Sequence, residues 1–379
     1  MPFGLYLHFP FCTHKCDYCD YYKEVLDSDQ ERRFYDALKT ETELAEHQAQ
    51  DTDHQISTLY IGGGTPSLTS LGRFEEWLDY LSRFFVVPQD IEFSFEINPE
   101  SCSRELLESL LKLGINRPVF GVQSFNTRLL KMLGRAHNLR QTHEAVYFAN
   151  ALGYDNFGCD LLYALPKQTG KMLSSDLDQM VDLAPPHISF YQLTVEEETA
   201  LWRKTENGKL KLPTVDHARA LYQAGYEKFT ETGYERYEVC SFAKPGHECR
   251  HNLNYWTGGD YIGLGPSAHS FLDGHRLFNK PSLAEYLTEL KQGRRPQVED
   301  ESGEAERMVE ALMVGLRLAS GVNLARFSER FNRDIGDLIN PEQYELLLES
   351  GHLIWDEDYL RLAEDSMLLA DEITLRLVR

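Results

Sequence analysis

The sequence predicts an α/β fold, a partial (β/α)6 barrel of the TIM type followed by a small C-terminal winged-helix-like α+β domain. Two patterns predict the barrel. Short β-rich runs alternate with longer amphipathic runs, as in a parallel sheet with crossover helices. Polar residues fall near the ends of the predicted strands, where barrel proteins carry their chemistry. The 379 residues, 42% hydrophobic and 26% charged, supply enough apolar material for a buried core.

Six βα units are predicted in residues 1–200, the barrel domain. The strand-like runs are 5–9, 57–61, 91–97, 119–122, 157–162 and 188–193. The helices, which have capping-type starts, are 28–48, 70–85, 103–113, 126–133, 139–152 and 171–183. A barrel built from these units gathers the loops that follow each strand on one face.

Two further regions follow the barrel. A helix at 215–230, the strand-like ERYEVCSF at 235–242 and the glycine-rich YIGLGPSAHS at 261–270 predict a barrel extension over 201–300. Residues 301–379 are predicted to be helical at 324–331 and 344–348, with short β-like pieces at 353–355 and 359–362 and a terminal helix. Winged helices often bind DNA, but the acidic segment 329–371 favours a packing module.

The charge balance excludes some partners. With 60 acidic and 38 basic residues, the net charge of -22 would repel a phosphate backbone, and no basic patch offsets it, so nucleic acid is not expected as a partner. The sequence contains no run of about 18 apolar residues and no secretory signal. We therefore expect a cytoplasmic protein without stable membrane insertion.

Three of the seven cysteines, Cys12, Cys16 and Cys19, lie within eight residues. Structural zinc sites need four closed ligands, whereas three thiolates can hold three irons of a [4Fe–4S] cluster and leave the fourth iron open. A zinc site completed by His8 or His14 is the alternative. The other cysteines at 102, 159 and 240 are typical of small buried hydrophobes.

Glycine and polar residues recur at the predicted strand ends. The run from Gly62 to Gly64 allows a close approach of backbone amides to a ligand, and without a following Lys-Ser/Thr it is no phosphate loop; a tight turn is the alternative. Four polar side chains interrupt apolar patterns at successive stations of the barrel: Glu96, Gln123, Arg135 and Asp160. Buried charge is costly, so these residues are predicted to face a ligand. An ion pair of Arg135 with Asp160 is the alternative.

The spacing Cys-x3-Cys-x2-Cys after a first strand is similar to the signature of radical S-adenosylmethionine (SAM) enzymes. The ordered segments 5–12, 62–67, 96–100, 121–125, 133–135, 160–169 and 265–269 resemble the oxygen-independent coproporphyrinogen oxidase branch. This resemblance implies that the open iron binds SAM and that an electron from the cluster cleaves it to a 5′-deoxyadenosyl radical. The SAM contacts it implies are Tyr6, Tyr18, Gly63, Gly64, Thr65, Glu96, Gln123, Arg135 and Asp160.

Two departures favour the heme chaperone branch of that family. Tyr21 stands where the oxidase carries a fourth cysteine, and the HNxxYW run from His251 to Trp256 resembles a motif of the chaperones. Heme needs an axial ligand and flat apolar walls. Candidate ligands are His251, Tyr255 and Cys249, with His269 a weaker one. A packed loop under the barrel mouth is the alternative.

The resemblance leaves four hypotheses of function. The first is a carrier that binds heme, a [4Fe–4S] cluster and SAM, receives electrons from a donor, and passes heme to an acceptor protein. The second is the radical oxidative decarboxylation of coproporphyrinogen III to protoporphyrinogen IX. The third is another radical SAM activity, and the fourth is a zinc-stabilised barrel without a redox role. Tyr21 and the HNxxYW run favour the first over the second.

Overall fold

Six parallel strands form the centre of the protein and lie side by side in chain order. The computed structural model describes residues 3–49 and 55–378. The strands are β1 (Phe3–Phe9), β4 (Ile56–Gly63), β5 (Glu92–Ile97), β6 (Arg117–Gln123), β7 (Gly158–Tyr163) and β8 (His187–Gln192). Each overlaps a strand that the sequence predicts, and the partial (β/α)6 barrel is confirmed.

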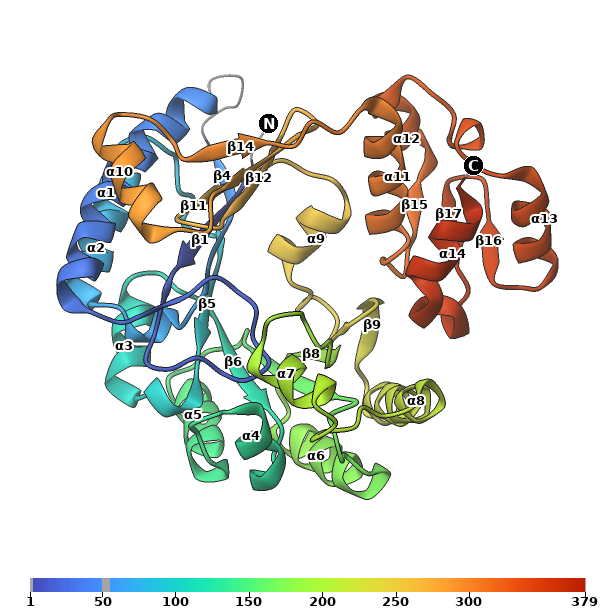
Figure 1. The fold of residues 1–379 in the computed structure, drawn as a ribbon, viewed down its shortest axis with the longest axis horizontal. Helices are drawn as coiled ribbons and strands as arrows, with labels where there is room; N and C mark the ends of the chain where they lie inside the picture. Colours follow the sequence, from blue (N-terminus) through green and yellow to red (C-terminus); the bar gives the residue numbers. More distant parts are fainter. Residues whose placement is uncertain (1–2, 50–54, 379) are drawn as a thin grey trace.

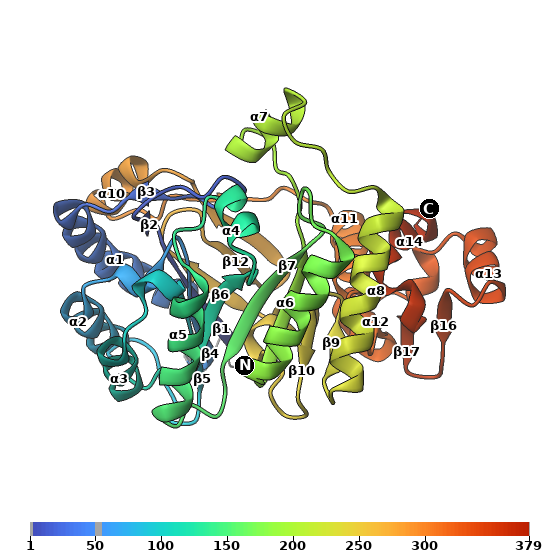
Figure 2. The same cartoon turned by 90° about the horizontal axis from the view of Figure 1, so that it is seen from below.

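Helices cover the outer side of the curved sheet, as Figures 1 and 2 show. They are α1 (Ser28–Gln48), α2 (Leu71–Leu81), α3 (Arg104–Lys112), α4 (Thr127–Leu133), α5 (Leu139–Ala151) and α6 (Gly170–Leu183). The α2 helix ends four residues earlier than predicted. Its last turn is replaced by a loop that places Phe85 in the core, where its ring packs edge-on against Phe3 at 5.6 Å.

The segment after the barrel divides between both edges of the sheet. The helices α7 (Ala200–Glu206) and α8 (Val215–Glu231) come next. Strand β10 (Ser241–Ala243) then pairs antiparallel with β8, and β9 (Glu235–Glu238) pairs antiparallel with β10 at the edge of the sheet. The chain then crosses back, and β11 (Tyr261–Leu264) pairs parallel with β1. That edge continues through β12 (His269–Leu272), β13 (His275–Asn279) and β14 (Gln297–Glu299), with α10 (Leu283–Lys291) before β14.

The short helix α9 (Arg250–Trp256) closes the concave side of the sheet (Figure 1). It contains the HNxxYW run, which the sequence did not predict to be helical. Glu92, the first residue of β5, accepts hydrogen bonds from the backbone N–H groups of Arg250 and His251, both at 2.9 Å. A carboxylate there satisfies helix donors that have no partner within the helix. Thr58, near the start of β4, also contacts His251, so α9 lies at the amino ends of the strands.

The C-terminal domain has its own hydrophobic core and the predicted winged-helix-like order. It consists of α11 (Glu304–Gly315), β15 (Val322–Asn323), α12 (Leu324–Phe331), α13 (Pro341–Glu349), β16 (Leu353–Trp355), β17 (Tyr359–Leu362) and α14 (Ala370–Leu377). The three strands form a small antiparallel sheet in the order β15-β17-β16. Within residues 3–49 and 55–378, no helix has the length and apolarity needed to cross a membrane.

We predict that Glu92→Ala destabilises the protein by about 2–4 kcal/mol. The buried N–H group of His251 loses its acceptor at about 1–3 kcal/mol, and the partly buried one of Arg250 at about 1 kcal/mol. Urea unfolding followed by circular dichroism measures the loss. Glu75→Ala, which removes an exposed carboxylate on α2, is the matched control and should change stability by less than about 0.5 kcal/mol. Equal stability of the two variants would contradict a role of Glu92 in holding α9.

Candidate functional site

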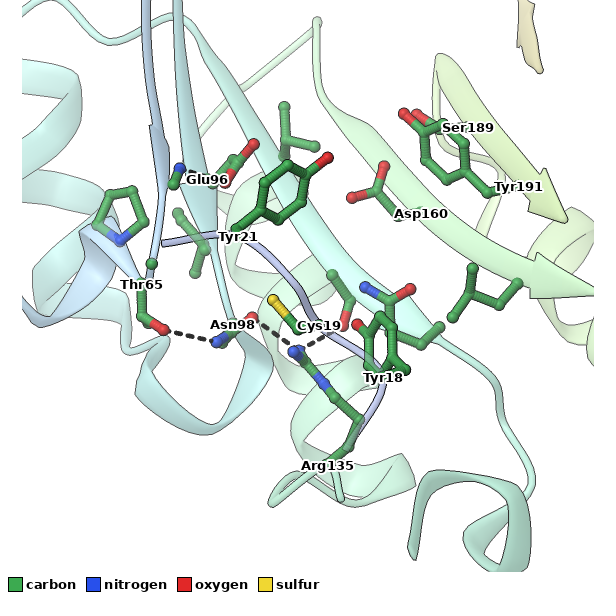
Figure 3. A pocket seen from close by; sticks show the side chains of 18 of the residues that line it. Tyr18, Cys19, Tyr21, Thr65, Glu96, Asn98, Arg135, Asp160, Ser189 and Tyr191 are labelled. Atoms are coloured by element: carbon green, nitrogen blue, oxygen red, sulfur yellow. Dashed lines mark hydrogen bonds between the residues drawn. The ribbon is translucent and has the colours of Figure 1, made fainter. Parts of the chain in front are cut away.

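A cavity of about 370 Å³ opens at the carboxyl ends of the barrel strands. Nearly all the residues predicted to contact SAM line it (Figure 3): Tyr18, Gly63, Gly64, Thr65, Glu96, Gln123, Arg135 and Asp160. Tyr6 lies outside the lining. Its hydroxyl is 3.2 Å from Nδ1 of the buried His8, and its ring packs against Tyr60, which does line the cavity. The structure thus brings side chains from β4 to β7 and from the cysteine loop to one place.

The three cysteines lie on the loop after β1, whose short strand β2 (Phe11–Cys12) pairs with β3 (Glu24–Val25). Each sulfur has a nearby donor, which comes from a distant part of the chain for Cys12 and Cys16 and from the same loop for Cys19. Thr65 Oγ1 lies 3.3 Å from the Cys12 sulfur, and Arg135 Nη1 lies 3.9 Å from that of Cys16. Lys23 Nζ lies 3.0 Å from the Cys19 sulfur. Donors of this kind stabilise thiolates, the form that ligates iron.

This donor set fits an iron–sulfur cluster better than a single metal ion. Within residues 3–49 and 55–378, no three His, Cys, Asp or Glu side chains converge closely enough to hold one ion. The histidines of the zinc alternative have backbone partners: His8 Nε2 is 2.8 Å from the carbonyl of Tyr22, and His14 Nε2 is 3.0 Å from that of Gly134. His14 Nε2 also lies 3.8 Å from the Cys16 sulfur. A cluster that spans several ångströms suits three separated thiolates.

The glycine run is explained by close packing of the chain. A Cβ at Gly64 would lie 2.6 Å from the backbone oxygen of Phe11, and one at Gly63, where φ is +109°, would lie 2.8 Å from the His8 ring. The amide of Gly64 donates to Phe9 and that of Gly63 to Glu96, at 2.7 and 3.3 Å. These amides already have protein acceptors. The glycines therefore bring the end of β4 against the cysteine loop. Gly63 and Gly64 also line the cavity, and a close approach of a ligand to them stays a prediction.

Two carboxyl groups face the cavity, Glu96 from β5 and Asp160 from β7, the strands on either side of β6 (Figure 3). Burial, followed by the charge of Asp160, raises the pKa of Glu96 to about 7, although Tyr60 donates to it at 3.0 Å. Burial likewise raises the pKa of Asp160 to about 6, against a hydrogen bond from Ser189. One buried oxygen of Asp160, Oδ1, has no hydrogen-bond partner. A cationic or donor group in the cavity would supply that partner.

Arg135 is held by uncharged acceptors. Its Nη2 donates to Asn98 Oδ1 at 2.7 Å and to the carbonyl of Gly121 at 3.0 Å, and Asn98 donates in turn to Thr65 at 3.1 Å (Figure 3). Among the described residues, no ion pair joins Arg135 to Asp160, so the structure contradicts the alternative of such a pair. Asn98 lies in the segment 96–100 that carries the family resemblance, but the sequence did not identify it as a site residue.

Gln123 ends β6 with a φ of +64°, a strained conformation for a residue with a side chain. The register between β6 and β7 shifts just before it. Gln123 thereby faces the cavity. Its Nε2 lies close to Gly121, since a Cβ on Gly121 would be 3.0 Å from that atom. Strand residues of the lining that sequence reasoning missed include Tyr60, Arg117, His187, Ser189 and Tyr191, and Asn252 of α9 lines the cavity as well. Alternation along β6 to β8 was the signal that could have found them.

The candidate heme ligands lie at the other end of the barrel, on and beside α9. His251 is 1% exposed, with Nδ1 2.8 Å from Thr58 Oγ1 and Nε2 2.6 Å from Tyr255 Oη. Burial lowers its pKa to about 3. Cys249 is fully buried and its sulfur contacts Glu92 at 3.7 Å. Iron ligation by any of these atoms stays a prediction, and in this arrangement each is already engaged with protein.

We predict that Glu96 makes stability depend on pH. An unfolded glutamate titrates near pH 4.3, and the folded one near pH 7, so the folded state holds the extra proton between them. Stability therefore falls as pH rises from about 4.5 to about 7, by about 1–3 kcal/mol. Glu96→Gln removes this contribution, so its melting temperature should fall less between pH 5 and pH 8 than that of the unaltered chain.

Glu75→Gln, an exposed substitution, is the control and should keep the slope of the unaltered chain. An unchanged slope in Glu96→Gln would show that Glu96 is ionised throughout this range.

Comparisons with known proteins place this geometry in a family. Residues 6–180 match the model of the radical SAM superfamily, and residues 304–369 match the HemN C-terminal domain. The heme chaperone HemW of Bacillus subtilis (strain 168) is 33% identical over 348 residues, 91% of each chain. The heme chaperone HemW of Escherichia coli (strain K12) is 32% identical over 352 residues, 92% of this chain and 91% of its own.

A solved structure supports the fold. Coproporphyrinogen III oxidase (HemN) from Escherichia coli, a radical SAM enzyme, superposes with a TM-score of 0.84 over 99% of this chain and 89% of its own. At 22% identity it shows the fold alone. Identity with the curated relatives extends over the barrel and the C-terminal domain together, and on that ground the chain belongs to the HemW family within the radical SAM superfamily.

Proposed function

We propose that this protein is a heme chaperone that binds heme, a [4Fe–4S] cluster and SAM, and transfers heme to an acceptor protein. The similarity to curated heme chaperones along nine-tenths of the chain carries this proposal. A relative of the same name from Mycobacterium tuberculosis (strain H37Rv) is 36% identical over 329 residues, so the similarity recurs in a third bacterium. The function thus includes both the barrel and the C-terminal domain.

The cluster would be held by Cys12, Cys16 and Cys19, whose sulfurs already have donors from Thr65, Arg135 and Lys23. When bound, a [4Fe–4S] cluster supplies one electron and an iron with an open coordination position. Burial raises the pKa of the Cys12 and Cys16 thiols, and the contacts with Thr65 and Arg135 act in the opposite direction.

The cavity suits SAM, which carries a cationic sulfonium, an ammonium and a carboxylate. We assign the cationic groups to the side of Glu96 and Asp160, where Asp160 Oδ1 has no partner. Arg135 lies beside Cys16 with its Nε unpartnered, so it offers a charge and a donor for an anionic group. Tyr18, Gln123 and Thr65 complete the lining on the cysteine side. Tyr6 would position Tyr60 and His8, which it contacts.

The alternative function is the oxidative decarboxylation of coproporphyrinogen III. One residue argues against it. Tyr21 occupies the position of the oxidase's fourth cysteine, and it lines the cavity with its side chain largely exposed. A phenol supplies neither the thiolate ligand nor the disulfide chemistry of a cysteine. The structural similarity to the oxidase extends to the fold, which both proteins share.

The cellular setting we propose is the cytoplasm, with an electron donor and a heme acceptor as partners. All seven cysteines are free, as expected in a reducing compartment. The net charge of -22 disfavours nucleic acid and anionic membrane surfaces as lasting partners.

We predict that Cys16→Ser removes most of the visible absorption of the reconstituted cluster, because a second iron then lacks its thiolate. Anaerobic reconstitution with iron and sulfide, followed by iron analysis, measures the loss. Cys102→Ser, at a partly buried cysteine outside the site, is the control and should retain the cluster. Full iron content in Cys16→Ser would contradict the ligand assignment.

Heme titration tests the function itself. We expect the reconstituted protein to bind about one heme per chain, with a saturable Soret shift, and to form no protoporphyrinogen from coproporphyrinogen III with SAM and reductant. A carrier needs stable heme binding and a decarboxylase does not. Turnover of coproporphyrinogen III would establish the alternative, and a protein that binds no heme would refute the chaperone.

A further inference from the structure

A second hollow, separate from the SAM cavity, lies between the barrel and the C-terminal domain. It consists of two adjoining parts of about 370 and 330 Å³ that share Trp256, Gly258, Ala311, Val314 and Arg330. Its walls come from the end of α9, from β11 and β12, and from α11 and α12, and Figure 1 shows α9 between the sheet and α11. We call this hollow the interdomain cleft. Its size is that of pockets that hold small-molecule ligands, roughly 300–1,000 Å³.

The interdomain cleft is cationic although the protein is strongly acidic. Five arginines line it against one carboxylate, Glu310. Arg276 pairs with Glu310, and Arg317 pairs with Asp371 at 3.0 Å. The remaining three are Arg307, Arg326 and Arg330, and the described residues give none of them an ion pair. In a chain of net charge -22, three unpaired arginines at one hollow indicate an anionic ligand.

Aromatic side chains form the walls between these charges. The Arg330 guanidinium lies over the rings of Phe271 and Phe331, 4.8 and 5.0 Å from their centroids. Arg317 lies over the Trp256 ring at 5.6 Å. Two buried donors in the lining have no hydrogen-bond partner, Trp256 Nε1 and Arg307 Nε. The ligand that fits is flat and apolar and carries anionic groups at its edge.

We propose that the interdomain cleft is the heme site, with Arg307 and Arg330 binding the two propionates and Trp256 and Phe271 contacting the macrocycle. This assignment rests on the proposed function. Heme combines a flat apolar ring with two carboxylates, and guanidinium groups pair with carboxylates through two parallel hydrogen bonds. A side chain at position 258 would collide with Arg330, because a Cβ on Gly258 would lie 2.4 Å from Arg330 Nη1. Gly258 therefore leaves room for the Arg330 guanidinium.

The HNxxYW run reaches from the barrel to the interdomain cleft. His251 faces the barrel and stacks on Tyr60, with ring centroids 5.1 Å apart. Tyr255, on the same face of α9 with its hydroxyl 2.6 Å from His251 Nε2, and Trp256 line the interdomain cleft. Heme bound there lies on the far side of α9 from the cysteine loop. This position suits a cargo that is stored and released, and it differs from that of a porphyrin substrate beside the cluster.

The test uses the full chain reconstituted with its cluster. The double variant Arg307→Gln/Arg330→Gln should weaken heme binding, followed by the Soret band, about tenfold or more per arginine. Cluster absorption and melting temperature should stay unchanged, because the barrel site is separate. Arg333→Gln, an exposed arginine outside the lining, is the matched control and should bind heme like the unaltered chain.

Heme dimethyl ester, which lacks both carboxylates, provides a second probe. The unaltered chain should bind it about as weakly as the double variant binds heme. If the unaltered chain binds heme and the double variant binds it equally well, the cleft assignment is wrong and the chaperone function stands. If the unaltered chain binds no heme, the proposed function fails first.

Discussion

The hydrogen bonds from the N-terminus of α9 to Glu92 are the constraint on which both cavities depend. A helix of seven residues is too short to be stable alone, so its position comes from tertiary contacts. The Glu92 carboxylate binds its first amides, and Thr58 and Tyr60 hold His251 on the barrel side. With α9 so placed, its first turn closes the amino end of the barrel and its last turn forms a wall of the interdomain cleft.

The sign of the charge differs from one site of this protein to another. The chain as a whole is acidic, yet the cysteine loop is met by Lys23 and Arg135, and the interdomain cleft by arginines. Inside the barrel the order reverses, and two carboxyl groups with raised pKa values face the cavity. The cysteine loop and the two carboxyl groups thus meet in one cavity, and the arginines line a second hollow.

The sequence predicted the barrel well because its signals are local. Alternating β and amphipathic runs gave all six strands, and α1 has the predicted bounds because Asp27 caps its first turn. The cysteine spacing and Tyr21 could also be identified directly. Contacts between residues that are distant in the sequence could not be predicted. Glu92 fixes α9, and β11 pairs with β1, although each pair is far apart along the chain. The role of the glycine run in packing depends on His8 and the cysteine loop, which no local pattern reveals.

When a cationic ligand binds in the cavity, its carboxyl groups release protons to the solvent. At pH 6 to 7 the Glu96 side chain holds its proton for a substantial fraction of the time, because its pKa is about 7. A sulfonium or ammonium beside it favours the ionised form, so the proton must leave as the cation arrives. The heat of binding measured by calorimetry then includes the heat with which the buffer takes up that proton. Phosphate and Tris solutions would report different enthalpies for the same complex.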